Sequence, residues 1–262
     1  MGKFPRVNIL GVGISAINLQ RAVGEIEDWI ASGVAHYVNL CTVHTVMECQ
    51  SDARLRQIVN ASGLSTPDGM PLVWLSWLHG HQDAERVYGP DLMLALCERS
   101  QTTGHRHFFY GGAPGVAERL VRRLRSRYPA LAVAGICSPP FRPVDAREDV
   151  ETLDAINAAA PDIVWVGLGT PKQDYWVSTH RPLLSAPALI AVGAAFDFHA
   201  GLLRQAPRWM QRSGLEWLFR LVQEPRRLAY RYLVYNPLFV FRTASQLAGF
   251  QRYTLGADAG NR

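Results

Sequence analysis

Short apolar runs alternate along this chain with longer amphipathic stretches, and this alternation restricts the fold more than any other feature of the sequence. The apolar runs predict strands at 7–12, 37–42, 107–110, 132–136, 163–166 and 188–192. Helical periodicity predicts helices at 18–31, 47–60 and 116–128. Because strands that alternate with helices pair in parallel and are covered on both sides, we expect an α/β fold. It would be a Rossmann-like, mostly parallel sheet with helices on both faces.

The pattern becomes helical only from about residue 204 onward, where Pro225 and Pro237 predict helix starts. Residues 204–252 carry nine arginines, two glutamates and no aspartate or lysine, so this segment has a net charge of +7 in a chain of net charge +5. Arginines interleaved with aromatic residues suit anionic lipid headgroups, diphosphates or nucleic acid. We therefore predict a catalytic domain over 1–203 and a helical, basic, membrane-facing appendage over 204–262.

Bulk properties point to a cytoplasmic protein. The four cysteines (Cys41, Cys49, Cys97 and Cys137) are scattered and form no C-x-x-C pair, which favours a reducing compartment and argues against a structural metal. We expect no signal peptide at the N-terminus, and no window approaches 18 uninterrupted apolar residues. Any contact with a membrane is therefore expected to be peripheral, on the inner face. An exposed apolar face on the appendage would favour a homo-oligomer.

The run Gly11-Val12-Gly13-Ile14-Ser15-Ala16 resembles a dinucleotide-binding fingerprint. In such a fingerprint an acidic residue ends the next strand and binds the ribose. The strand predicted at 37–42 supplies no acidic residue. Two interpretations stay open: an NAD(P)-dependent oxidoreductase that uses Gly11–Ala16, and a tight turn that opens a core helix, which we favour.

Several polar residues follow predicted strands. Thr66-Pro67-Asp68-Gly69 fits a type I turn, and its position near the ligand crevice of such a sheet makes Asp68 a candidate base. Glycines that end strands offer backbone N–H groups to an anion, and either ordinary turns or phosphate-binding turns would explain them. These are Gly111, Gly112, Gly167 and Gly169, followed by Lys172 and Gln173. Asp197 stands in an apolar setting and needs a hydrogen-bonding partner or a ligand.

Other catalytic signatures are absent from the sequence. It contains no Asp-x-Asp, no Gly-x-Ser-x-Gly, no Walker loop and no His-Glu-x-x-His. We therefore expect neither a metal nor a cofactor.

Taken together, the motifs resemble the WecG/TagA/CpsF glycosyltransferases, glycosyltransferase family 26, over nearly the whole chain. The matching segments are TPDG at 66–69, RVYGPDL at 86–92, FYGGAPGV at 109–116, VGLGTPKQDYW at 166–176, GAAFDFHAG at 193–201, RQAPRW at 204–209 and GLEWLFRLVQEPRRLAYRYL at 214–233. This resemblance implies inverting, metal-independent transfer from a UDP-sugar donor to a polyprenyl-diphosphate-linked sugar acceptor. Products of this kind enter exopolysaccharide, teichoic acid or common-antigen biosynthesis.

The resemblance also implies roles for individual residues. Asp68 matches the proposed general base, and Thr42, Arg86 and Gln173 fall at positions that line the same pocket. The appendage that closes over the site on the membrane is matched by Arg220, Arg226, Arg227 and Arg231. His44 stands where the family usually has Asn, which indicates a different donor or acceptor sugar.

The sequence is compatible with three functions: the membrane-associated glycosyltransferase, the oxidoreductase, and a non-enzymatic adaptor that binds nucleic acid through 204–252. Strand-end glycines argue against the adaptor, because such a module needs no anion-binding crevice. We expect no nucleic acid partner.

Overall fold

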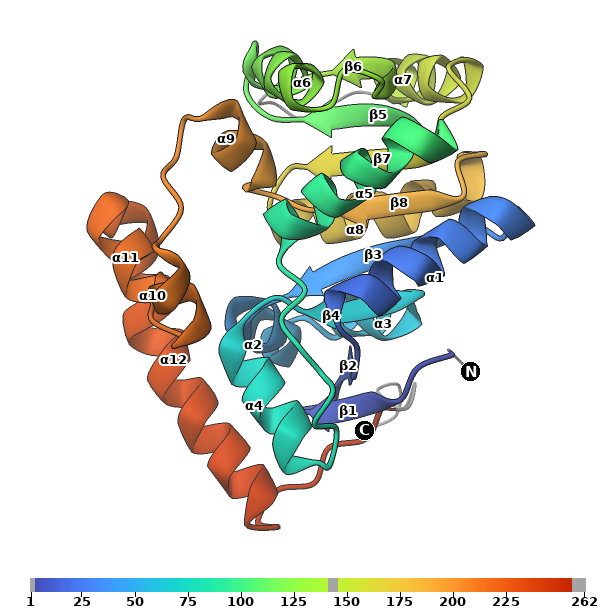
Figure 1. The fold of residues 1–262 in the computed structure, drawn as a ribbon. Coiled ribbons are helices and arrows are strands. Elements are labelled where there is room, and N and C mark those ends of the chain that lie inside the picture. The colour runs from blue at the N-terminus through green and yellow to red at the C-terminus, as the bar shows by residue number, and fades with distance from the viewer. Residues whose placement is uncertain (1–2, 141–145, 256–262) are drawn as a thin grey trace. The chain divides into compact units, whose positions relative to one another are not determined.

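The computed structural model describes residues 3–140 and 146–255, which form two compact units (Figure 1). Unit 1 consists of the described residues of Met1–Asn18, Leu40–Tyr88 and Gln205–Arg262, and unit 2 of those of Leu19–Asn39 and Gly89–Arg204. The chain crosses between the two units four times, and one of these crossings, between Asn39 and Leu40, falls within a strand. The division predicted at residue 203 stays a prediction.

A six-stranded sheet has the strand order β4-β3-β8-β7-β5-β6. Its strands are β3 (His36–Cys41), β4 (Leu64–Pro67), β5 (Arg106–Gly111), β6 (Ala132–Cys137), β7 (Ile163–Gly167) and β8 (Ala188–Ala191). The four pairings from β3 across to β6 are all parallel. The predicted α/β class with a mostly parallel sheet is therefore confirmed, and all six apolar runs contain at least one strand.

Unit 2 holds most of this sheet and the helices that cover it. These are α1 (Leu19–Ser32), α5 (Gly89–Thr103), α6 (Val116–Arg127), α7 (Ala146–Ala158), α8 (Lys172–His180), the 3₁₀ turn η1 (Arg181–Leu183) and α9 (Ala195–Ala200). Figure 1 shows α1 and α5 on the near side of the sheet and α8 on the far side. Trp165 of β7, Phe109 of β5 and Phe196 of α9 are fully buried in its core. The predicted helices on both faces are thus confirmed.

Unit 1 combines an antiparallel hairpin with helices from both ends of the sequence. Its elements are β1 (Arg6–Ile9), β2 (Val12–Ser15), α2 (Val43–Ser51), α3 (Ala53–Ala61), β4, α4 (Met70–Leu78), α10 (Arg208–Arg212), α11 (Glu216–Gln223) and α12 (Pro225–Leu247). Helix α12 packs on α2 and α11, and α4 contacts β1 and β4. The predicted helical character of the C-terminal region is confirmed.

The glycine run at 11–16 forms part of the hairpin and is not a dinucleotide-binding turn. Ile9 pairs with Val12, and the two residues between them have positive φ angles, 52° at Leu10 and 81° at Gly11, as in a type I′ turn. Since the fingerprint requires a strand, a turn and then a helix, the dinucleotide interpretation is wrong. The helix-opening turn is wrong as well, because α1 begins only at Leu19.

Side chains of unit 1 satisfy all four backbone polar groups of this turn. The N–H and C=O of Leu10 bond to Gln246 and Gln50, both at 2.9 Å. Those of Gly11 bond to Asn8 and Asn60, also both at 2.9 Å. A buried turn without such partners would be destabilised, so these four side chains explain how a leucine tolerates the left-handed conformation.

Three further local predictions are wrong. The helix expected at 47–60 is two helices that meet at Asp52, whose backbone ends α2 and whose Oδ1 accepts a hydrogen bond from the Leu55 N–H at 2.9 Å. Thr66–Gly69 is no type I turn, since β4 ends at Pro67 and Gly69 precedes α4 directly. Pro237 starts no helix but lies inside α12.

The C-terminal helices of unit 1 are anchored on one side and exposed on the other. Gln246 donates to the Asn8 carbonyl oxygen at 2.8 Å, and Asn8 donates to that of Tyr253 at 2.6 Å. In contrast, Trp209 is 63% exposed and Phe250 is 85% exposed. None of the helices in 3–140 and 146–255 is both long enough and apolar enough to cross a bilayer.

Candidate functional site

A cavity of about 1050 Å³ lies within unit 1. Its wall combines the loop between β3 and α2, the segment from Asp68 into α4, the loop residues Arg86 and Tyr88, and the helices α10, α11 and α12. Six of the residues that the sequence singled out line it, namely Thr42, His44, Asp68, Arg86, Arg220 and Arg231. The fold thus brings into one cavity residues that are up to 189 positions apart in the chain.

Asp68 follows β4 immediately, and its backbone is fixed from both sides. Its N–H donates to the Cys41 carbonyl oxygen at 2.8 Å, and its own carbonyl oxygen accepts from Arg86 Nε. The side chain is only 17% exposed. Burial raises the pKa of this carboxyl to about 6; the Arg86 guanidinium opposes the shift and the Glu216 carboxylate adds to it. A carboxyl with this pKa is mostly ionised at neutral pH and still basic enough to accept a proton.

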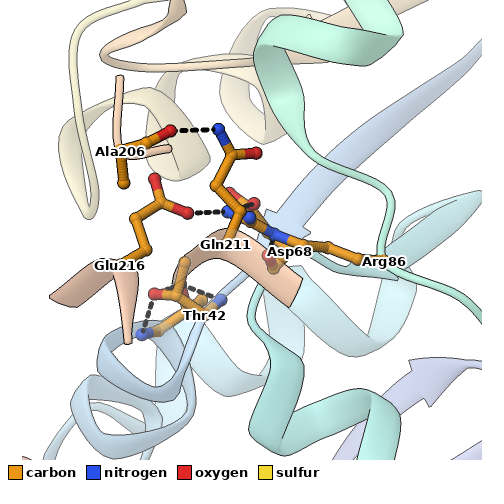
Figure 2. Close-up of polar contacts among 7 residues, drawn as sticks. Thr42, Asp68, Arg86, Ala206, Gln211 and Glu216 are labelled. Atoms are coloured by element: carbon orange, nitrogen blue, oxygen red, sulfur yellow. Dashed lines mark hydrogen bonds and ion pairs between the residues drawn. The ribbon is translucent and has the colours of Figure 1, made fainter. Parts of the chain in front are cut away.

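Arg86 joins two carboxylates in the cavity (Figure 2). Its Nη2 lies 2.5 Å from Glu216 Oε2 and 3.4 Å from Asp68 Oδ1, and the guanidinium stacks 4.0 Å above the centroid of the Tyr88 ring. Because Glu216 makes the closer contact with Arg86, the ion pair between Arg86 and Asp68 is weaker than it would be without Glu216. The base is therefore held in place without being locked in a tight ion pair.

Sequence reasoning missed Glu216. The motif match over 214–233 contains this residue but assigns no role to its carboxylate. A signal was present, since Glu216 is one of only two acidic residues in the arginine-rich segment 204–252. Its partner Arg86 is 130 residues away, so only the fold could identify the pair.

Thr42 caps the helix that forms one wall of the cavity. Its Oγ1 accepts from the Thr45 N–H at 3.3 Å, while its own N–H donates to Thr45 Oγ1 at 3.2 Å, so the two threonines form a reciprocal cap at the start of α2 (Figure 2). Thr42 and the first two residues of α2 line the cavity, so the partial positive charge of this helix N-terminus favours an anionic ligand there.

His44 lies on the first turn of α2 and stacks on Tyr235 of α12, with ring centroids 5.7 Å apart. Tyr235 Oη donates to Glu48 at 2.9 Å, and His44 Nδ1 lies 3.6 Å from the same carboxylate oxygen. Burial, together with the charge of Arg231, lowers the pKa of His44 to about 3. The imidazole is therefore neutral at pH 7 and can both donate and accept a hydrogen bond.

The arginines of the appendage divide into two groups. Arg220 and Arg231 lie in the cavity wall, and burial lowers the pKa of Arg231 to about 10, which leaves it charged at neutral pH. Arg226 and Arg227 are exposed and lie outside that wall, and Arg227 pairs with Glu224 at 2.5 Å. Of these four arginines, only Arg220 and Arg231 are therefore in a position to contact a ligand in this cavity.

The remaining predicted residues belong to unit 2. Gly111 and Gly167 end the adjacent strands β5 and β7, and a Cβ on Gly111 would lie 2.6 Å from the Gly167 carbonyl oxygen. The N–H of Gly112 donates to that same oxygen at 3.0 Å, and the N–H of Gly169 donates to Gln173 Oε1 at 3.0 Å. These glycines therefore allow close strand packing, and two of their N–H groups are already engaged.

The other three predicted residues of unit 2, Gln173, Lys172 and Asp197, differ in exposure, and His199 lies near them in the sequence. Gln173 is buried at the start of α8, whereas Lys172 beside it is exposed. Asp197 is half-buried in α9. His199 bonds to the Pro90 carbonyl oxygen at 2.9 Å, as a satisfied structural histidine does. Whether Gln173, Lys172 and Asp197 bind a substrate stays a prediction.

Within the described ranges, no three His, Cys, Asp or Glu side chains gather as a metal site would require. The charged groups of the cavity are instead two carboxylates and three guanidinium groups, those of Asp68, Glu216, Arg86, Arg220 and Arg231. Guanidinium groups form charge-assisted, often bidentate hydrogen bonds with phosphate oxygens. A buried base beside guanidinium groups suits an enzyme that transfers a group away from a phosphate-bearing carrier.

Comparison with known proteins identifies the class. The profile of the glycosyl transferase WecG/TagA/CpsF family matches residues 7–253. The chain belongs to this family and is a glycosyltransferase. The resemblance drawn from the motifs is thereby confirmed.

Individual relatives are similar to this chain over most of its length. A protein of Bacillus spizizenii is 29% identical over 193 residues, which cover 74% of this chain and 72% of the relative. One of Bacillus subtilis is 32% identical over 172 residues (65% and 64%), and one of Staphylococcus aureus is 24% identical over 241 residues (91% and 92%). All three are named N-acetylglucosaminyldiphosphoundecaprenol N-acetyl-beta-D-mannosaminyltransferase.

Proposed function

We propose that this enzyme transfers a sugar from a UDP-sugar to a saccharide linked to a polyprenyl diphosphate, with inversion at the anomeric carbon. The observation that carries the proposal is the cavity of unit 1, where Asp68, a carboxyl with a pKa of about 6, lies together with three arginines. The names of the relatives support a lipid-diphosphate acceptor. His44, which stacks on Tyr235, adds a polar group to the cavity wall at a position where the family usually has Asn. The transfer assay below identifies the sugar.

Asp68 acts as the general base in this mechanism. Its carboxylate takes the proton of the acceptor hydroxyl while the hydroxyl oxygen forms a bond to the anomeric carbon of the donor sugar. The bond from that carbon to the diphosphate oxygen breaks, and UDP leaves with the electron pair. One base suffices for such a displacement, and a pKa slightly below the working pH combines a high ionised fraction with useful basicity.

The arginines stabilise the departing diphosphate. Negative charge grows on the leaving oxygen as the bond breaks, and preorganised cations lower the barrier most where that charge develops. Arg220 of α11 and Arg231 of α12 both line the cavity, where their guanidinium groups would face the diphosphate; Arg220 also lies 3.8 Å from Glu224 Oε2. The N-terminus of α2, capped by Thr42, adds backbone N–H groups on the same cavity wall.

The C-terminal helices provide the contact with the membrane. Exposed apolar side chains on α10, α11 and α12 lie among exposed arginines such as Arg208, Arg212, Arg226 and Arg227. Apolar residues that insert at the lipid boundary, combined with basic residues that attract anionic headgroups, favour peripheral binding to the inner face of a cytoplasmic membrane. Sedimentation with vesicles would test this: binding should be stronger to anionic than to zwitterionic vesicles and should weaken with salt.

The reaction itself is tested with a panel of radiolabelled UDP-sugars and a lipid-linked acceptor that carries N-acetylglucosamine. Label that enters the organic phase from one donor would establish the reaction and identify the sugar. Asp68→Asn should lower the rate by about 10²–10⁴, the range typical of a lost general base, while UDP binding stays within about twofold of wild type. Asp83→Asn, which changes an exposed carboxylate outside the cavity wall, is the matched control. Full activity of Asp68→Asn would eliminate Asp68 as the base.

A further inference from the structure

The cavity of unit 1 changes character along its length. Its charged residues stand near the starts of α4 and of α12: Asp68 precedes α4 by two positions, and Arg231 lies in the second turn of α12. In Figure 1 the two helices run in roughly the same direction, and residues of both line the cavity. Because a helix rises about 1.5 Å per residue, Leu78 lies roughly 12 Å beyond Met70, and Phe241 roughly 15 Å beyond Arg231.

The residues that line the far part of the cavity are apolar on both helices. We call this part the apolar half of the cavity and define it by Trp74, Leu75 and Leu78 of α4 and Pro237, Val240 and Phe241 of α12. Residues 74 and 78 are one helical turn apart, as are 237 and 241, so each helix presents an apolar stripe. None of the lining residues after Asn236 carries a charge.

Three of these side chains stay largely uncovered although they line a concave wall, whereas Leu75 is buried. Leu78 is 71% exposed, Phe241 is 67% exposed and Val240 is 64% exposed. Apolar surface in contact with water is unfavourable, and a contiguous apolar surface that is hollowed between two helices indicates a ligand site. A neutral hydrocarbon fits this half, just as an anionic group fits the arginines of the other half.

We propose that the apolar half of the cavity binds the first isoprene units of the acceptor lipid, next to its diphosphate. The inference rests on the proposed function and extends it by naming the residues that hold the hydrocarbon chain. An amphipathic molecule with a diphosphate at Arg220 and Arg231 would extend its chain along α4 and α12, because the two surfaces belong to one continuous cavity.

Binding of small prenyl diphosphates in solution tests the site without any need for catalysis. Calorimetry would compare inorganic diphosphate, dimethylallyl diphosphate and geranyl diphosphate, in the absence of vesicles and detergent. Each buried CH₂ strengthens binding by about fourfold, so even partial burial should give roughly a tenfold gain for each added isoprene unit. The heat capacity of binding should become more negative with chain length.

Val240→Asp and Leu78→Asp should remove most of this gain while leaving the affinity for inorganic diphosphate within about twofold. Both residues are exposed, so the substitutions should not unfold the protein. Val222→Asp is the matched control, since Val222 is 75% exposed on α11 and lies outside the cavity wall. Equal affinity for all three diphosphates, or equal effects of Val240→Asp and Val222→Asp, would overturn the proposal.

A transfer assay separates this inference from the proposed function. With water-soluble acceptors that carry one, two or three isoprene units, KM should fall with chain length, and Val240→Asp should raise KM at unchanged kcat. Effects of Val240→Asp that arise only when vesicles are added would mean that these residues contact the bilayer, and the subsite would be rejected. Prenyl diphosphate binding without transfer to any acceptor would keep the subsite and refute the proposed function.

Discussion

The ionised form of Asp68 should destabilise the folded protein, so that Asp68→Asn makes the enzyme more stable at neutral pH. The carboxyl has a pKa of 3.8 when unfolded and about 6 in the folded state, chiefly because of burial. Each unit of pKa difference corresponds to about 1.4 kcal/mol, so ionisation disfavours the folded state by up to about 3 kcal/mol. Asparagine has no charge to bury, and Arg86 keeps its partner Glu216 at 2.5 Å.

The sign of the effect depends on pH. A carboxyl whose pKa rises on folding stabilises the folded protein only while it is protonated, which is the case below the unfolded pKa of 3.8. This stability is lost as the pH increases from 3.8 through about 6, and above that range the loss is constant. The advantage of Asp68→Asn should therefore be near zero at about pH 3.5 and reach its full size at about pH 7.5.

Thermal unfolding of both proteins at several pH values measures this difference. At about pH 7.5 the variant should melt up to roughly 6–12 °C higher than wild type, because 1 kcal/mol shifts Tm by about 2–4 °C in a chain of this size. Asp83→Asn should show no such pH-dependent gain. If Asp68→Asn were less stable than wild type at neutral pH, Asp68 would instead form a net favourable ion pair with Arg86, and the reasoning from burial would be refuted.

Three further predictions concern single contacts. Glu216→Gln should move the acid limb of the pH–rate profile to lower pH. The substitution removes a negative charge that raises the pKa of Asp68, and it frees Arg86 to pair with the Asp68 carboxylate. Glu85→Gln, which changes an exposed residue, should leave the profile in place. Gly111→Ala should lower the free energy of unfolding by roughly 2–4 kcal/mol in urea, since its Cβ would meet the Gly167 carbonyl oxygen, whereas Gly104→Ala meets no atom within 4 Å and should cost only about 1 kcal/mol. Asn60→Ala should cost about 1–3 kcal/mol in the same assay without changing kcat, because it leaves the Gly11 C=O and Gly13 N–H unpaired; a loss below about 0.5 kcal/mol would show that water replaces the amide.

Five of the six strands of the sheet, all except β4, could be predicted from sequence because parallel strands are buried on both faces and therefore read as continuous apolar runs. The same property hid the hairpin: residues 9–12 are all buried, so nothing in their hydropathy marked the turn at Leu10 and Gly11. That turn is stabilised by Gln246 and Asn60, far along the chain, and not by a local Asn-Gly signal. The break at Asp52, in contrast, carried a local capping signal that periodicity alone overlooked.

The candidate site could be predicted in part. Motif resemblance selected Thr42, Asp68 and Arg86, which the fold places around one cavity. Resemblance could not show that α11 brings Glu216 to Arg86, since that contact depends on how the C-terminal helices pack against residues 40–88. Nor could it separate Arg231, in the cavity wall, from Arg227, which is four residues earlier on the same helix and exposed.

Glu216 explains how a base can work beside three guanidinium groups. Burial is the main cause of the raised pKa of Asp68, and the guanidinium groups of Arg86 and Arg220 oppose it; without a second carboxylate their effect would be larger and Asp68 would be a weaker base. Glu216 takes the shortest contact of Arg86, and its negative charge raises the pKa of Asp68 together with burial. In the proposed mechanism, Arg220 and Arg231 are the cations that face the diphosphate. The proposed site would thus hold an anionic base close to an anionic leaving group, because Glu216 partly neutralises Arg86, the arginine that pairs with the base.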